Sequence, residues 1–145
     1  MDLNEIKTPH FSLSEMLRSD IATQRGIANT PSVGVLENIC RLMTEVLEPA
    51  RVKLDAPVII TSGYRSVELN YAVGGVANSQ HVKGQAADLV CTKLTDKKRL
   101  FDILAAMDID QILWETNSQG TQWIHVSYVS PDKNRHIVNR NYRAR

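Results

Sequence analysis

The sequence predicts an α+β fold in which N-terminal helices pack on a small, mainly antiparallel sheet. Helix signals come early: Ser12 and Glu15 form a capping box, and a second helix begins after the loop over residues 26–32. Strand signals come later, as short β-branched or alternating apolar runs separated by polar, glycine-containing loops. A run of helices followed by a run of strands is typical of the α+β class.

Each element follows from a local pattern. In the second helix, Leu36, Met43 and Ala50 fall on one apolar stripe that would face the sheet. Ser66 is the expected N-cap of a short helix, and Thr95 that of a longer helix over residues 96–107. The predicted strands span residues 58–61, 86–91, 110–115 and 122–128, and a hairpin loop over residues 116–121 joins the last two.

Length and charge set further limits. The chain has 145 residues, enough for one core, so we expect a single domain over residues 1–145, acting as a monomer. The formal net charge is +1, which gives no strong field that would attract nucleic acid. Residues 131–145 form a basic tail with Lys133, Arg135, Arg140, Arg143 and Arg145. We interpret it as a solvated tail, with attraction to an anionic polymer such as cell wall as the alternative.

The N-terminal segment bears on localisation. It carries acidic residues early and no apolar run of signal-peptide length, and no stretch of the chain approaches a membrane span. We therefore expect synthesis in the cytoplasm without a signal peptide, no membrane partner, and action outside only after release. Cys40 and Cys91 stand apart in apolar company and are expected to be buried free thiols.

One short segment, "SQHVKGQAADLV", carries a candidate metal site. His81 precedes a turn that Gly84 permits, and Asp88 lies inside the following apolar strand. A carboxylate there is costly unless its charge is compensated, and zinc compensates it well. In the last predicted strand, His125 alternates with apolar residues and would face a cleft. Three protein ligands that leave one position open are the pattern of a catalytic zinc.

Each of these residues could instead have an ordinary structural or surface role. A single histidine is more often a hydrogen-bonded residue than a ligand, and Asp88 could pair with Lys83 or cap a turn. Arg65 follows a strand in a glycine-containing loop, where it could grip a carboxylate or an oxyanion, or lie on the surface. Glu115 ends a strand next to that of His125 and could act as a general base, or be solvated.

The ordered set of motifs "SGYRS", "LN", "VGG", "SQHVKGQAADL" and "QWIHVSY" resembles the M15-type zinc peptidases. These include D-alanyl-D-alanine carboxypeptidases and dipeptidases and the L-alanyl-D-glutamate endopeptidases of phage lysis, which share the hedgehog/DD-peptidase fold. The resemblance covers roughly residues 11–128. The segments "FSLSEMLRSDIATQRGIANTP" and "VLEPAR" resemble the single-domain branch common in phages and prophage-carrying genomes.

The resemblance implies roles for named residues. His81, Asp88 and His125 would bind Zn²⁺, and Arg65 would bind the substrate or stabilise its oxyanion. Ser79 and Gln80 flank the first ligand and would orient it or touch the peptide. The candidates for the cleft wall are Tyr64, Trp114 and Trp123, with core packing as the alternative for each.

One position departs from the family pattern. Many members carry the catalytic acid three residues before the last histidine, where this chain has Gln122. An amide cannot take a proton from water at neutral pH. The nearest acid is Glu115 on the neighbouring strand, within about 5 Å for antiparallel neighbours.

These observations predict a zinc metallopeptidase that hydrolyses peptidoglycan stem peptides, of the L-Ala-D-Glu endopeptidase or D-Ala-D-Ala carboxypeptidase type, in the setting of phage or prophage lysis. Glu115 and Arg65 are the predicted catalytic residues. Two alternatives remain. One is a non-catalytic, zinc-containing wall-binding or virion protein, and the other is an interaction domain with a structural zinc or without metal.

Overall fold

The computed structural model describes residues 5–144, so the outermost ends of the predicted domain and tail lie outside it. Five strands form one sheet in the order β1-β2-β4-β3-β5, and all neighbours are antiparallel except β3 and β5. The strands are β1 (Ile59–Ser62), β2 (Ala86–Val90), β3 (Gln111–Thr116), β4 (Gln122–Ser127) and β5 (Ile137–Arg143). The predicted α+β class with a mainly antiparallel sheet is confirmed.

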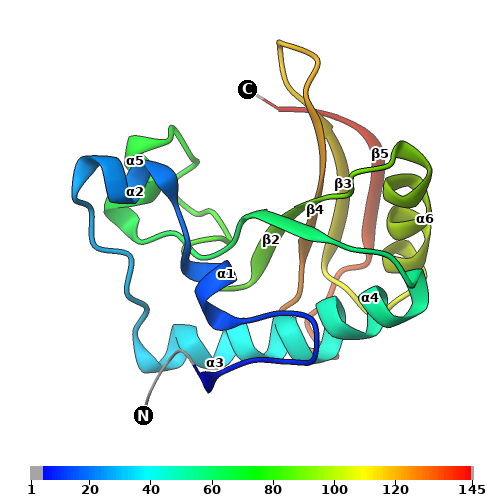
Figure 1. Cartoon of the computed structure of the whole chain (residues 1–145), viewed down its shortest axis with the longest axis horizontal. Helices are drawn as coiled ribbons and strands as arrows, with labels where there is room; N and C mark the ends of the chain where they lie inside the picture. Colours follow the sequence, from blue (N-terminus) through cyan, green and yellow to red (C-terminus); the bar gives the residue numbers. More distant parts are fainter. Residues whose placement is uncertain (1–4, 145) are drawn as a thin grey trace.

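Helices precede and flank this sheet. They are α1 (Leu13–Leu17), α2 (Asp20–Arg25), α3 (Val33–Leu42), α4 (Glu48–Leu54), α5 (Val67–Ala72) and α6 (Leu94–Ala105). A π-helical turn, Met43–Leu47, joins α3 to α4. In Figure 1, α3 and α4 run along the lower side of the sheet and α6 stands beside β3 and β5.

Serine caps start most of the early helices. The predicted capping box is present, because the Ser12 side chain accepts from the Glu15 backbone while the Glu15 carboxylate accepts from Ser12. Ser66 caps α5, as predicted. The expectation for Thr95 is wrong: α6 begins at Leu94, before Thr95, with Lys93 as an N-cap whose side chain makes no capping bond. Thr95 therefore lies inside the first turn, where its own backbone is already helical.

The two faces of the sheet differ, because strand side chains alternate. Ile112, Ile124 and Val126 are buried against the helices, and Leu42 and Val46 of the long helical segment join the same core. The opposite face carries the polar side chains of β2, β3 and β4, including Asp88, Glu115 and His125. The helices thus close one face and leave the other as the floor of a cleft.

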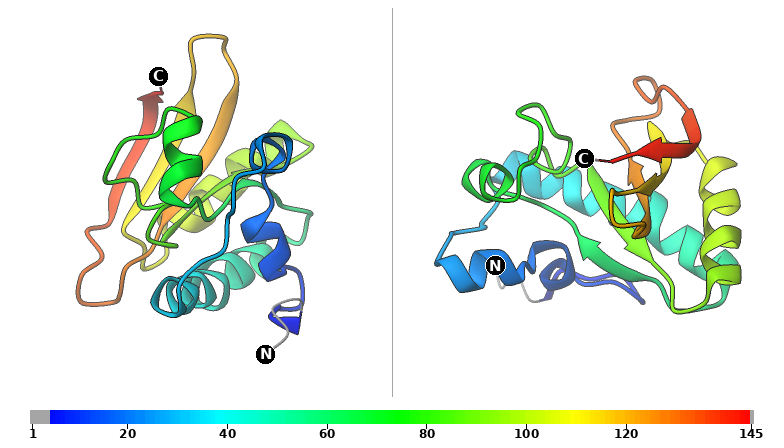
Figure 2. Two further views of the ribbon diagram at one scale, coloured as in Figure 1. Left: turned by 90° about the vertical axis from the view of Figure 1, so that its left-hand side faces the viewer. Right: turned by 90° about the horizontal axis from the view of Figure 1, so that it is seen from above.

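The C-terminal segment differs from the prediction. The side chains of Ile137–Arg143 are exposed, as expected for a solvated tail, but the segment forms β5 and pairs in parallel with β3. Figure 2 shows it along the outer edge of the sheet. The pairing satisfies the backbone groups of an otherwise open β3 edge. Backbone bonds from His136 to Ile109 and from Ile137 to Asp110 begin it.

Buried Asp110 secures the start of this strand. The residue is 1% exposed, and its carboxylate accepts hydrogen bonds from Arg135 Nε at 2.9 Å and Nη2 at 2.7 Å. The backbone N–H of Arg135 and the side-chain amide of Gln80 donate to it as well, each at 3.0 Å. The bonds from Arg135 are the main cause that lowers the pKa of Asp110 to about 2.

This ion pair predicts an acid-sensitive contribution to stability. A carboxyl whose folded pKa is depressed stabilises the fold above its unfolded pKa of about 3.9, and the contribution is lost as the pH falls through the folded pKa of about 2. Asp110→Asn should lower the free energy of unfolding at pH 7 by about 2 kcal/mol and flatten its decline below pH 5. Urea unfolding across pH checks this.

The matched control is Asp102→Asn. Asp102 pairs with Arg140 at 2.9 Å, but both side chains are mostly exposed. The expected change is below about 0.5 kcal/mol, as for surface ion pairs. Equal effects of the two substitutions would contradict the prediction.

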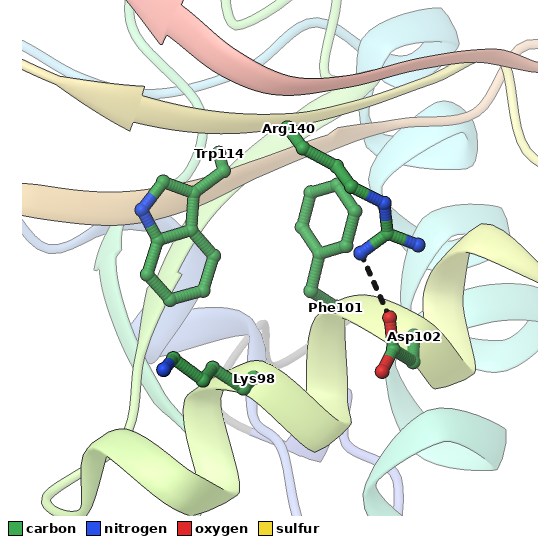
Figure 3. A pocket seen from close by; sticks show the side chains of 5 residues that line it. All are labelled: Lys98, Phe101, Asp102, Trp114 and Arg140. Atoms are coloured by element: carbon green, nitrogen blue, oxygen red, sulfur yellow. Dashed lines mark hydrogen bonds and ion pairs between the residues drawn. The ribbon is translucent and has the colours of Figure 1, made fainter.

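Asp102 and Arg140 border a hollow of about 300 Å³ on the helix side of β3 and β5, together with Lys98, Phe101 and Trp114 (Figure 3). The Arg140 guanidinium lies over the Phe101 ring, 4.7 Å from its centroid. Phe101 and Trp114 pack edge to face. Trp114 therefore belongs to the face away from the cleft, which decides between the two interpretations of this residue.

Across residues 5–144, no helix combines the length and the apolar character needed to cross a membrane. Cys40 and Cys91 are free, as predicted, but they are half-buried rather than fully buried.

Candidate metal centre

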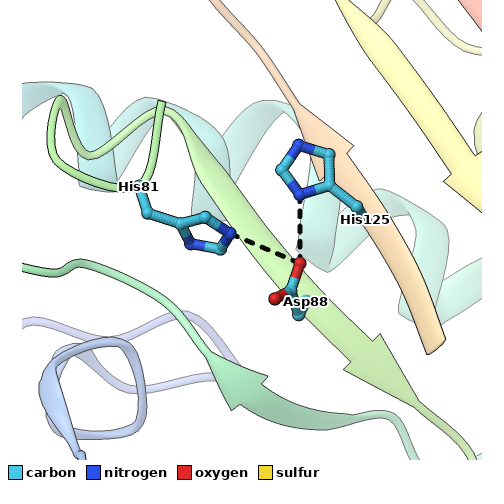
Figure 4. A group of neighbouring side chains, drawn as sticks. All are labelled: His81, Asp88 and His125. Carbon is cyan, nitrogen blue, oxygen red and sulfur yellow. Dashed lines mark hydrogen bonds and ion pairs between the residues drawn. The ribbon is translucent and has the colours of Figure 1, made fainter. Parts of the chain in front are cut away.

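Two strands and a loop bring the three predicted ligands together. Asp88 of β2 lies directly opposite His125 of β4 in the antiparallel register, so both side chains project from the same face. His81 comes from the loop before β2 and points at the same carboxylate (Figure 4). Gly84, with a φ of 71°, makes the turn between His81 and Asp88, and a side chain there would collide with α3.

The spacing of the ligand atoms fits a zinc ion. Asp88 Oδ1 lies 3.0 Å from His125 Nδ1 and 3.4 Å from His81 Nε2. At bond lengths of 2.0–2.2 Å, two ligand atoms of a tetrahedral zinc are about 3.3 Å apart. All three ligand atoms lie within 4.8 Å of one another. Three ligands leave one tetrahedral position for water or substrate.

A backbone contact fixes the ring of His81. Its Nδ1 lies 2.7 Å from the carbonyl oxygen of Gly63, which can only accept, so Nδ1 carries the proton and donates. The lone pair of Nε2 is therefore free on the side of Asp88, the arrangement that metal-binding histidines need. A side chain at Gly63 would overlap the backbone of Met16, so this close approach requires glycine.

The buried carboxylate gives the centre a negative charge. Burial of Asp88 opposes its ionisation, but attraction to the protonated form of His81 and the hydrogen bond from His125 outweigh burial and hold the pKa of Asp88 well below its usual range. Burial likewise opposes protonation of His125, whereas its hydrogen bond to Asp88 raises the pKa. An ionised, buried carboxylate between two imidazoles attracts a cation.

Arg65 is held beside this centre and is not a surface arginine, since its side chain is 18% exposed. Its Nη2 lies 3.7 Å from Asp88 Oδ2, Nε donates to Ser62 Oγ at 3.1 Å, and Nη1 donates to Asn70 Oδ1 at 3.3 Å. Burial lowers the pKa of Arg65, and the charges of Asp88 and Glu115 oppose that shift. The planar group is thus oriented along the cleft.

Glu115 also lines the cleft. It lies opposite Trp123 in the β3–β4 register, and Trp123 Nε1 donates to Glu115 Oε2 at 2.6 Å. Burial and the charge of Asp88 raise the pKa of the Glu115 carboxyl. A carboxylate whose pKa is raised toward neutrality suits proton transfer.

The remaining predicted site residues divide into two groups. Ser79 Oγ accepts from the His81 backbone at 3.2 Å, and Gln80 donates to Asp110, so both steady the loop that carries His81. Both line the cleft, as does Trp123. Tyr64 does not line this cleft: the residue is 8% exposed and belongs to the core, and it borders a separate hollow together with Arg65.

Gln122, at the position of the family's usual acid, lies outside the cleft. It is exposed, and its amide lies 3.4 Å from Thr116 Oγ1. In a regular strand, a residue three positions before His125 projects to the opposite face. Glu115 is therefore the acid that β3 and β4 bring to the metal ligands.

Several residues that line or support the cleft were not predicted from the sequence. Asn70 is buried, orients Arg65, and donates to the Val76 carbonyl at 2.8 Å. The "LN" motif was the available signal. Arg135, Tyr142 and Ala144 line the cleft, whose volume is about 610 Å³, from the C-terminal segment. No periodicity in that segment indicated it.

Two histidines and one aspartate form a ligand set with one open coordination position, on the sheet face that the helices do not cover. A carboxylate and an oriented arginine lie in the same cleft. This combination defines the class of zinc metallopeptidases. The chain belongs to the peptidase M15 family, whose model matches residues 9–127, and the predicted resemblance is confirmed.

A curated relative agrees with zinc as the metal. The zinc D-Ala-D-Ala carboxypeptidase of Streptomyces albus G is 51% identical over 35 residues. That match covers 24% of this chain and only 14% of the relative, so the likeness concerns a short part of the other protein.

Proposed function

We propose that this chain hydrolyses stem peptides of peptidoglycan as a zinc-dependent D-Ala-D-Ala carboxypeptidase. The observation that carries the proposal is a single cleft that combines the open ligand set with Glu115 and Arg65. The name of the Streptomyces relative supports the carboxypeptidase type. The resemblance of residues 11–31 to the phage-associated branch supports a setting in phage or prophage lysis.

The metal ligands and Glu115 have different roles in hydrolysis. Zinc held by His81, Asp88 and His125 supplies Lewis-acid chemistry when bound, acidifying water to a pKa of about 7 and polarising a carbonyl. The hydrogen bond from Trp123 Nε1 holds the Glu115 carboxylate, which takes the proton of the attacking water and returns it to the leaving amine.

Arg65 has a separate task. Its guanidinium is fixed by Ser62 and Asn70, with its remaining donors beside the metal ligands. It binds the terminal carboxylate of the peptide, or the oxyanion that develops at the scissile carbonyl. The planar guanidinium can donate two parallel hydrogen bonds to either anion.

The test is mass analysis of muropeptides after digestion of purified peptidoglycan with zinc-loaded protein. A carboxypeptidase shortens pentapeptide stems by one terminal alanine. Release of whole peptides cut after L-Ala would instead assign the endopeptidase type. Unchanged muropeptides, with folded protein that contains zinc and sediments with insoluble wall, would replace the proposal with a non-catalytic wall-binding function.

A further inference from the structure

The C-terminal segment builds a second wall of the metal-bearing cleft. Arg135, Tyr142 and Ala144 line the cleft together with the ligands, although they follow the part of the chain that the family model matches. Tyr142 lies beside Glu115 in the parallel β3–β5 register, so its side chain projects from the cleft face. This wall is therefore a feature of this chain's own C-terminal residues.

Arg135 is presented to the cleft in a fixed orientation. Nε and Nη2 are bound to buried Asp110, and the side chain is still 55% exposed. Within residues 5–144, Nη1 of Arg135 makes no hydrogen bond. A guanidinium locked on one edge loses little conformational entropy when its other edge binds an anion.

Lys83 adds a second positive charge to the cleft, in the loop whose Gln80 side chain donates to Asp110. It is exposed in the turn that follows His81 and lines the cleft, and among the ion pairs of the described part of the chain none involves its side chain. Arg135 is already paired with the buried carboxylate of Asp110, which leaves the charge of Lys83 without a carboxylate partner among the described residues. This part of the cleft therefore carries an excess of positive charge.

Arg65 and Arg135 lie on opposite sides of the metal ligands. Arg65 follows β1 at one edge of the sheet, whereas Arg135 precedes β5 at the other, and Asp88 and His125 lie on the strands between them. Neighbouring strands are about 4.8 Å apart, so an extended peptide of a few residues bridges the two sites. A peptide held by Arg65 at its terminus reaches the other site with a residue on the far side of the scissile bond.

We propose that Lys83 and Arg135 bind a second carboxylate of the peptide substrate, an acidic side chain on the N-terminal side of the scissile bond. The inference rests on the proposed function and specifies its substrate: a peptide with one carboxylate at the terminus and another upstream. Asp110 acts as the positioning residue for Arg135, and Tyr142 flanks the bound chain.

The test uses two peptides that end in D-Ala-D-Ala and differ only in an upstream residue, Glu or Gln. Their binding to the full-length, zinc-loaded Glu115→Gln protein is measured by calorimetry, so that the peptide is not consumed. We expect the Glu peptide to bind about 10-fold more tightly, Lys83→Gln to reduce that preference to about 3-fold or less, and Lys83→Glu to abolish or invert it. These substitutions leave the Asp110–Arg135 pair intact.

Lys98→Gln is the matched control, because it removes the same charge from the hollow on the other side of β3. It should leave the preference unchanged. The inference is overturned if the Glu115→Gln protein with Lys83 unchanged binds both peptides with equal affinity. It is also overturned if the preference for the Glu peptide survives Lys83→Glu. If in that case the wild type hydrolyses both peptides equally well, the proposed function stands and only the inference about the second carboxylate fails. If neither peptide is bound or cleaved, both fail.

Discussion

Glu115→Gln is expected to retain fold and zinc while losing hydrolysis by about 10²-fold or more, the usual contribution of a general base. The amide keeps the size of the side chain and an oxygen that can accept from Trp123 Nε1, but it cannot take a proton. Turnover of a D-Ala-D-Ala peptide, with zinc content measured on the same sample, checks this. The loss should fall on kcat, because the interaction is made in the transition state.

Gln122→Glu is the informative companion. Gln122 is exposed and outside the cleft, so a carboxylate there should be tolerated and should not restore activity to Glu115→Gln. A Glu115→Gln enzyme that turns over as fast as the wild type would refute the base assignment. Rescue by Gln122→Glu would show instead that position 122 reaches the metal.

His81→Ala should abolish tight zinc binding and with it all measurable hydrolysis. The wild type should hold one zinc per chain, since its three ligand atoms are already gathered within 4.8 Å. Zinc that binds only the native state adds about 4 kcal/mol to stability at 1,000 times its dissociation constant. Elemental analysis, and thermal unfolding with and without added zinc, should show that the variant neither contains zinc nor responds to it.

His10→Ala is the control for this substitution. His10 pairs with Glu48 at 2.6 Å, away from the cleft, and is partly exposed. The variant should retain one zinc and full thermal stabilisation by the metal. A His81→Ala protein that keeps stoichiometric zinc would disprove the ligand set.

Local sequence was sufficient to predict the three residues that the structure gathers as a candidate metal site, because they share strong local constraints. His81 and Asp88 flank a turn that needs Gly84, and His125 alternates with buried Ile124 and Val126. Period-two alternation assigns a side chain to a face without knowledge of the partner strand. The predicted hairpin loop over residues 116–121 put Glu115 on the strand next to that of His125, and the β3–β4 register agrees.

Orientation within the site depended on contacts distant in sequence. The tautomer of His81 is set by the carbonyl of Gly63, and the direction of Arg65 by buried Asn70. Tyr64 shows most clearly that local sequence does not fix the direction of a side chain. Its place in "SGYRS" suggested the cleft, but the turn at Gly63, closely packed on α1, sends the ring into the core.

The sequence by itself determined the α+β class, the helices that begin at Leu13, Val33 and Val67, the strands β1 to β4 and the choice of His81, Asp88 and His125 as predicted metal ligands, since capping, periodicity and glycine turns act over a few residues. Only the tertiary structure decided that Ile137–Arg143 is a strand. Its side chains are exposed throughout, so no burial pattern marks it, and its pairing depends on the open edge of β3 and on buried Asp110 bound by Arg135. Strand pairing is a non-local contact whose free energy depends on the partner's position in the fold, and for that reason the second wall of the cleft could not be read from the chain alone.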